Sequence, residues 1–185
     1  MCNAYDIETH KHTFAVWAAS RAASVRSCPF TVQYGKALLE GCGFDRDFAT
    51  PERLPTATHI DKRHRKWRDL MIAYAADSMP SKRGGALTHG VAAKLINCYL
   101  KARFVCGGHH AHERVTCLHP PIDGQILRRF SKSIANNRPR EAAKLGQARW
   151  SALTSDQYEE LIKIIRTRCG GEPLWKIEVH WPGYQ

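Results

Sequence analysis

The sequence predicts an all-α protein of about seven or eight helices, folded as one compact domain over residues 1–185. Three observations predict this fold class. Apolar residues recur at intervals of three and four in most long segments, which is the period of an amphipathic helix. Capping residues, prolines and glycine pairs separate these segments. Only the tail, PLWKIEVHWPGYQ, shows some alternation, so we expect a short C-terminal strand or an arm packed on the helices.

Each predicted helix has its own local signals. In the first, an apolar face repeats at Phe14, Trp17, Ala18, Ala22 and Val25. Thr31 can cap the second helix, while Thr154 and Gln157 have the spacing of a capping box before the last one, which Gly170 ends. The predicted helical segments are 11–25, 32–39, 58–76, 91–104, 122–135, 140–153 and 155–169. They form three parts: N-terminal helices in 1–80, a central part in 86–135, and C-terminal helices with the tail in 140–185.

The charge predicts a polyanionic partner. The chain has 28 Lys and Arg against 17 Asp and Glu, a net charge of +11. This balance favours nucleic acid over a membrane surface, although a soluble domain that is merely basic would look the same. No apolar run is long enough to span a bilayer, and no signal peptide is expected. Seven scattered cysteines suggest a reduced, intracellular chain. We further expect a monomer in the cytoplasm or nucleoid.

The helix over 58–76 is expected to bury an apolar face and to expose a basic one. Thr58 and Asp61 have the spacing of a capping box. The expected buried residues are Ile60, Trp67, Leu70, Met71 and Tyr74. The expected exposed residues are Lys62, Arg63, His64, Arg65, Lys66 and Arg68. Of these, Lys62, Arg63, Arg65 and Lys66 are the candidate phosphate contacts, with an ordinary solvated helix face as the equal alternative.

Two ionisable residues stand near the starts of two central helices. Lys94 lies in an otherwise apolar helical run, and Asp123 follows His119, Pro120, Pro121 and Ile122 at the head of the next helix. Taken singly, a lysine in such a run is usually a surface residue with a buried stem. An aspartate at a helix start is usually a favourable dipole placement. Only their combination indicates a site.

The combination of Gly90, Lys94 and the Pro121-Ile122-Asp123 element resembles the helix-hairpin-helix DNA glycosylases of the 8-oxoguanine and endonuclease III type. The resemblance covers about forty residues and implies a helix-hairpin-helix element. It also implies removal of a damaged or modified base from DNA, with strand cleavage at the abasic site, in repair or in defence against modified foreign DNA. Lys94 would be the nucleophile and Asp123 the electrostatic and acid–base partner.

The resemblance also implies where DNA is held. The backbone of the hairpin would bind a phosphate at its helix N-terminus, with contacts from Thr88, His89, Gly90 and Ala92. Candidates for the pocket that receives the extruded base are His119, Trp67 and Tyr99.

Six soft or borderline ligands fall within fourteen residues of the loop before Asp123. A zinc site built from Cys106, His109, Cys117 and His119 is a weaker alternative, because the spacing is not one of the usual zinc patterns. No cofactor is therefore expected, and a DNA-contacting loop is favoured. Two other functions stay open: a non-catalytic nucleic-acid-binding helical module, and a zinc-stabilised interaction protein.

Overall fold

The computed structural model describes residues 5–29, 31–78 and 87–183. Within these ranges the chain forms nine α-helices, two of them single turns, and no β-strand; an isolated bridge pairs Val25 with Cys28. The all-α prediction is confirmed. In the described part of the chain, no helix combines the length and apolar character needed to cross a membrane.

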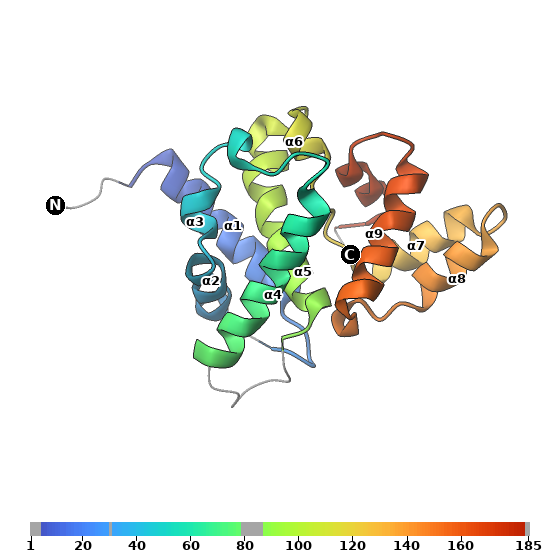
Figure 1. Cartoon of the computed structure of the whole chain (residues 1–185), viewed down its shortest axis with the longest axis horizontal. Coiled ribbons are helices and arrows are strands. Elements are labelled where there is room, and N and C mark those ends of the chain that lie inside the picture. Colours follow the sequence, from blue (N-terminus) through green and yellow to red (C-terminus); the bar gives the residue numbers. More distant parts are fainter. Residues whose placement is uncertain (1–4, 30, 79–86, 184–185) are drawn as a thin grey trace.

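The helices form two groups that lie side by side in Figure 1. The N-terminal group comprises α1 (Ile7–Ala23), α2 (Val32–Gly41), α3 (Phe44–Asp47), η1 (Pro51–Arg53), α4 (Ile60–Ser78), α5 (His89–Leu100), the π-helical continuation η2 (Lys101–His109) and α6 (Glu113–Thr116). The C-terminal group comprises α7 (Gly124–Ile134), α8 (Pro139–Gln147), η3 (Trp150–Ala152), α9 (Ser155–Cys169) and η4 (Leu174–His180).

Two apolar clusters hold these groups together, and α5 belongs to both. Most of its buried residues, from Val91 to Leu100, pack in the first cluster, where α5 contacts α1 and α4. Ala93, on the other side of the same helix, packs into the cluster formed by α7, α8, α9 and η4. Trp150 contacts both clusters. The helix that carries Lys94 is therefore the structural link between the two groups.

Several predicted helix ends are confirmed. The Thr31 hydroxyl accepts from the Tyr34 N–H at the start of α2. Thr154 and Gln157 form the reciprocal capping box at the start of α9, and Gly170 ends that helix with φ of 60° in the left-handed region. Ending a helix in this way suits glycine, which has no Cβ to clash.

Other expectations about the elements are wrong. The strand expected as one alternative for the tail is wrong: the tail is the 3-10 helix η4, which packs against α7 and α9, so the other alternative, an arm packed on the helices, is confirmed. The segment 140–153 is not one helix, because the chain turns to an extended conformation at Ala148 before η3. Asp61 does not close a capping box with Thr58. Its carboxylate is bound by two side chains of the C-terminal half, so a tertiary contact has replaced the local one.

Two burial expectations also fail in α1 and α4. Phe14 and Trp17 are half-exposed, because α1 turns its small residues Ala15, Ala19 and Ala23 toward α5. Leu70 on α4 is likewise 50% exposed. The reverse error concerns His64 and Arg68, expected on the surface of α4, which are completely buried.

Candidate active site

Lys94 and Asp123 form a direct ion pair. The Lys94 Nζ lies 3.0 Å from Asp123 Oδ2. Lys94 is only 6% exposed, since it points from the middle of α5 toward the start of α7. Its ammonium also lies 5.7 Å from the centre of the Trp150 ring. The structure thus brings together the two residues that the sequence singled out.

Asp123 is the N-cap of α7, so its position is set by the backbone. Oδ1 accepts from the N–H groups of Gln125 and Ile126, both at 2.9 Å, and leaves Oδ2 for Lys94. Burial by itself would raise the pKa of Asp123, but the charge of Lys94 and these N–H groups outweigh it and hold the pKa below its ordinary value. The carboxylate is therefore ionised and fixed in direction.

The pair lines a pocket of about 240 Å³ at the junction of the two helix groups. Its wall is mostly apolar. The lining residues are Phe14, Ala18 and Ala22 of α1; Lys94, Cys98, Lys101, Ala102 and Cys106 of α5 and η2; Pro121, Asp123 and Ile126 around the start of α7; and Glu178 and Trp181 near the C-terminus. A mostly apolar pocket with a few convergent polar groups is the usual form of a small-molecule site.

A second ion pair, between Lys101 and Glu178, lines the same pocket. Lys101 follows Lys94 by seven residues, or two helical turns, so both amines face the pocket from one side of the helix. Between them lies Cys98, and burial raises the pKa of this thiol to about 11. A thiol with such a pKa is a poor nucleophile at neutral pH, so Cys98 is not a candidate nucleophile of the pocket.

A buried polar network behind the pocket joins α4, α5 and α9. The His64 Nε2–H donates to Asn97 Oδ1 at 2.7 Å, and the Arg68 guanidinium donates to His64 Nδ1 at 2.7 Å. The Asn97 amide then donates to the Tyr158 hydroxyl at 2.9 Å and to the Pro120 carbonyl at 3.0 Å. Since Pro120 leads into the loop of Asp123, this network ties that loop to α5.

The network ends at a carboxylate. His119 Nδ1 lies 3.1 Å from the Tyr158 hydroxyl, and its Nε2–H donates to Asp61 at 2.8 Å. Arg166 donates to both oxygens of Asp61 at 2.7 Å. The donors and acceptors of these hydrogen bonds match when both histidines are neutral. Burial accordingly lowers the pKa of His64 and of His119, while the bonds from His119 and Arg166 lower the pKa of Asp61.

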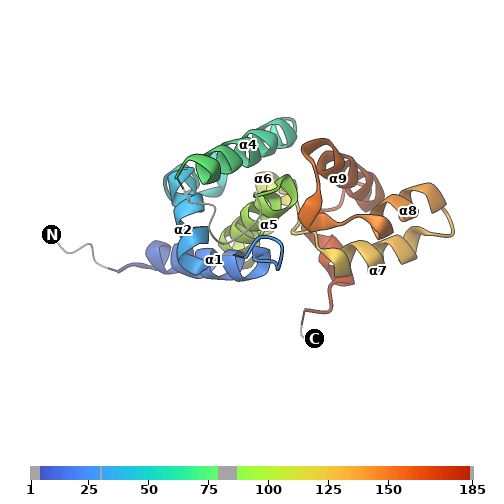
Figure 2. The same cartoon turned by 90° about the horizontal axis from the view of Figure 1, so that it is seen from below.

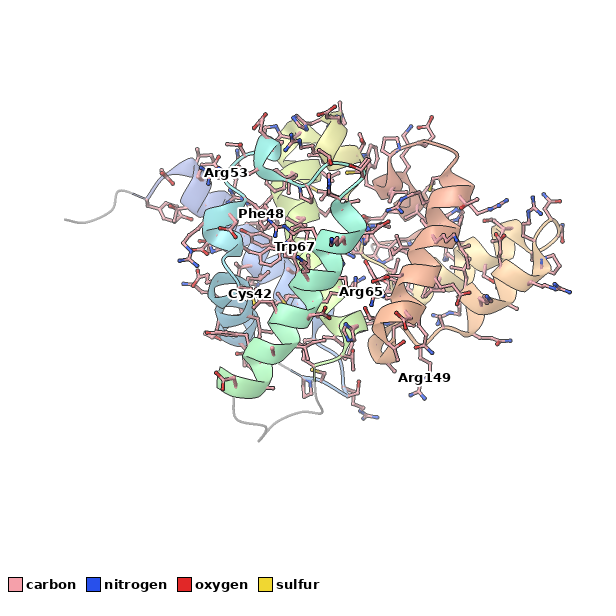
Figure 3. All side chains as sticks on the ribbon, in the orientation of Figure 1. Cys42, Phe48, Arg53, Arg65, Trp67 and Arg149 are labelled. Carbon is pink, nitrogen blue, oxygen red and sulfur yellow. The ribbon has the colours of Figure 1, made fainter. Side chains whose placement is uncertain are left out.

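None of the three predicted base-pocket residues lines this pocket. His119 is committed to the network just described, on the far side of its loop. Trp67 packs in the N-terminal core with its ring 5.0 Å from that of Phe48 (Figure 3). Tyr99 is fully buried, with its hydroxyl 2.9 Å from the His12 ring. Trp67 and Tyr99 pack in the core because large aromatic rings bury the most apolar area.

Of the four predicted hairpin contacts, Gly90 and Ala92 are buried by the chain itself, and Thr88 and His89 are partly buried. The Thr88 hydroxyl accepts from the Val91 N–H and donates to the Ser151 carbonyl, so it acts as a helix cap held against η3. Gly90 lies so close to Trp150 that an added Cβ would be 1.7 Å from the Trp150 carbonyl oxygen. Ala92 is completely buried and His89 lies near Asp69. The first helix of the expected hairpin falls in 79–86, outside the described residues.

The predicted basic face of α4 lies away from the pocket. Figure 2 shows α4 on one side of α5, and α1 and α7 on the other, and no α4 residue lines the pocket. Arg65 reaches from α4 to α9, where it binds Glu159 and Asp156 (Figure 3). Lys62, Arg63 and Lys66 are exposed, with no acidic partner among the described residues. The α4 cations and the Lys94–Asp123 pair therefore do not form one site.

The Cys/His loop does not gather a metal site in the described part of the chain. No three side chains of His, Cys, Asp or Glu there come close enough to hold an ion. Cys106 faces the pocket, Cys117 Sγ donates to the Arg114 carbonyl, and His119 is bound to Asp61. His109 instead packs 6.3 Å from the Phe104 ring. The four weak zinc candidates thus point to different surroundings.

Sequence reasoning missed the pocket wall supplied by α1 and by the segment around Glu178 and Trp181. One signal was present in the second half of α1, where eight of the ten residues from Phe14 to Ala23 are apolar. Such a helix can bury one face in a core and offer the other to a ligand. Comparison of this chain with family models, with curated proteins and with solved structures gave no match.

Proposed function

We propose that the protein is a DNA glycosylase with abasic-site lyase activity, in which Lys94 is the nucleophile. The observation that carries the proposal is the buried Lys94–Asp123 pair at the wall of a mostly apolar pocket. Few proteins place a lysine in such a pocket for stability alone, because a buried ion pair is seldom more stable than apolar residues of the same volume. The net charge of +11 supports a nucleic-acid substrate.

The proposed reaction begins when the target base leaves the stack and enters the pocket. The C1′–N glycosidic bond breaks, and its electron pair departs with the base, which takes a proton from the Lys94 ammonium. The resulting neutral amine bonds to C1′. The C1′–O4′ bond then opens, O4′ takes the second proton of the amine, and a protonated Schiff base remains. Loss of a C2′ proton expels the 3′ phosphate and cuts the strand.

Asp123 would act through its fixed carboxylate. The sugar gains positive charge as the glycosidic bond breaks, and an ionised oxygen beside C1′ stabilises that charge. Because Oδ1 is held by two backbone N–H groups, Oδ2 needs no rearrangement to face the reacting carbon. The apolar wall of the pocket excludes water and strengthens this electrostatic effect.

The alternative is a nucleic-acid-binding module without chemistry. Exposed cations without an acidic partner among the described residues favour it, and they gather in the α7–α8 region at Arg128, Arg129, Lys132, Arg138, Arg140 and Arg149. In that case the Lys94–Asp123 pair would only join α5 to α7. The zinc-stabilised alternative lacks a gathered ligand set in the part of the chain described.

Borohydride trapping separates these functions. The protein is incubated with DNA carrying an abasic site or one of a panel of modified bases, and the Schiff base is reduced to a stable adduct. We expect a covalent adduct whose sugar is found by mass spectrometry on Lys94. Lys94→Gln should abolish it, and Asp123→Asn should slow it by about a hundredfold or more.

Lys101→Gln is the matched control, because Lys101 offers a second paired amine in the same pocket. The adduct should still form in this variant. An adduct that persists in Lys94→Gln would refute the assignment of the nucleophile. If neither trapping nor base release occurs on any substrate while DNA binding is retained, the non-catalytic module is the correct function.

A further inference from the structure

Exposed aromatic side chains surround the mouth of the pocket. Phe14 and Trp181, which line it, are 54% and 42% exposed. Trp17, one turn from Phe14 on α1, is 52% exposed, and the two ring centres lie 5.9 Å apart at an angle of 34°. Grouped exposure of large apolar side chains usually marks an interaction surface.

Arginines without acidic partners flank these rings. Arg21 follows Trp17 by one turn on α1, next to the pocket residues Ala18 and Ala22, and is exposed. Across the pocket, Arg128 folds back over the first turn of α7: a Cβ added to Gly124 would lie 2.9 Å from its Nη1. The Arg128 guanidinium therefore lies near Gly124, the residue that follows Asp123 in the chain. Among the described residues, neither Arg21 nor Arg128 forms an ion pair.

We propose that the pocket takes its nucleotide from an unpaired DNA strand that lies across α1 and the start of α7. Neighbouring bases stack on Trp17 and Phe14, and the phosphates of the strand bind Arg21 and Arg128. The inference rests on the proposed function for the choice of DNA, and it adds that the substrate is single-stranded.

The combination of rings and cations is what selects this form of DNA. A single strand offers the faces of its bases as well as its phosphates, and aromatic side chains beside a basic track use both. In a duplex the base faces are stacked on each other, so exposed aromatic side chains of a protein have no free base face on which to stack. An unpaired nucleotide also enters the pocket without the cost of opening a base pair.

The placement of charge agrees with this substrate. The helix α4, which carries the unpaired cations Lys62, Arg63 and Lys66, lies on the opposite side of α5 from α1 and α7 (Figure 2). A strand that enters the pocket cannot lie on α4 at the same point. This geometry supplies matched controls, because α4 carries both an exposed apolar residue, Leu70, and exposed cations, none of which lines the pocket.

The test measures binding by fluorescence anisotropy, with a labelled oligodeoxynucleotide as a single strand and as its duplex, over a range of salt concentrations. We expect the single strand to bind at least ~10-fold more tightly than the duplex. Trp17→Ala should weaken single-strand binding by about tenfold, the effect of one lost stacking contact. Arg128→Ala should weaken it and reduce the salt slope by roughly 0.7, the value for one lost phosphate contact on a single strand.

Leu70→Ala and Lys66→Ala are the controls and should each change single-strand affinity less than about twofold. Equal affinity for duplex and single strand, or losses in the α4 controls as large as those at Trp17 and Arg128, would overturn the inference. Its failure is distinct from failure of the proposed function. If a Lys94 adduct forms on duplex DNA and single strands are not preferred, the proposed glycosylase function holds and this inference is wrong. If single-strand binding depends on Trp17 and Arg128 but no adduct forms, this inference holds and the proposed catalytic function is wrong.

Discussion

The side-chain amide of Asn97 donates to the carbonyl oxygen of Pro120 at 3.0 Å. Asn97 lies one turn after Lys94 on α5, and Pro120 lies three residues before Asp123. This hydrogen bond therefore connects the helix of the lysine to the loop of the carboxylate. It also anchors the network of His64 and Tyr158, since Asn97 is the only side chain that bonds both of them among the described contacts.

Removal of this amide should destabilise the protein strongly. Asn97→Ala leaves the His64 Nε2–H and the Pro120 carbonyl buried without partners, and each such group costs about 1–3 kcal/mol. We expect the free energy of unfolding, measured in urea, to fall by about 3 kcal/mol. Asn136→Ala changes an exposed asparagine and should stay within about 0.5 kcal/mol of the wild type. Similar effects of the two substitutions would contradict the central role of Asn97.

The two members of the Lys94–Asp123 pair should respond differently to removal. Asp123→Ala deletes the α7 cap, worth about 1 kcal/mol, and leaves the buried ammonium unpaired, worth about 3–5 kcal/mol more. Lys94→Met retains the stem volume and leaves Asp123 bound to two N–H groups, so a change under about 1.5 kcal/mol is expected.

Urea denaturation of both variants and of the double variant measures this difference. In the Lys94→Met background, the loss caused by Asp123→Ala should shrink to about that of the cap alone. Losses that simply add would mean that the two side chains do not interact.

Mild acid should destabilise the fold through His64 and His119. The pKa of each is lowered below its ordinary value of 6.5, by burial first. For His64, the nearby His119 and Arg68 lower the pKa further, and the bond to Asn97 and the charge of Asp61 partly oppose them. For His119, the bond and charge of Asp61 oppose burial, while Arg166 and Arg68 add to it. The unfolded chain therefore binds more protons than the folded one below pH 6.5. Stability is complete above that pH and decreases as pH falls below it, by up to about 1.4 kcal/mol per pH unit for each histidine.

Urea midpoints between pH 7.5 and about pH 5 test this dependence. His59 is exposed, and His59→Gln should leave the profile unchanged. Flat stability across that range would show that the buried histidines are not neutral in the folded protein.

Gly90 should be intolerant of any side chain. An alanine Cβ at this position would lie 1.7 Å from the Trp150 carbonyl oxygen and 2.9 Å from its carbonyl carbon. Both of these Trp150 atoms belong to the backbone, so they cannot move aside as the end of a flexible side chain could. We expect Gly90→Ala to lower the free energy of unfolding by about 3 kcal/mol, as in other overpacked sites. At Gly107 the nearest atom to an added Cβ is 3.7 Å away, so Gly107→Ala should be neutral or slightly stabilising.

Thermal melting of the two variants decides this point. A harmless Gly90→Ala would mean that α5 and η3 do not approach as closely as the structure indicates. The result also bears on interpretation, because Gly90 resembled part of a DNA-binding hairpin in sequence, whereas a close approach of two backbones explains it in the structure.

Local sequence was sufficient for much of the fold. The helices were predictable because each hydrogen-bonds within itself and signals its ends, as Thr31, Thr154 and Gly170 do. The pairing of Lys94 with Asp123 was predictable only through the resemblance of a motif. Where a terminal signal competed with a tertiary partner, as at Asp61, the local expectation failed.

The fold class, most helix ends and the candidate pair were predictable without the structure, since period, caps and short motifs depend on residues near one another in the chain. Tertiary structure alone decided which polar residues of α4 are buried, because α9 supplies Glu159 to receive Arg68 and Tyr158 to pack on His64. It also decided the pocket, whose walls come from α1, α5 and the segment near Trp181. Contacts between residues more than eighty positions apart leave no periodic trace in the chain, so only the packed structure reveals them.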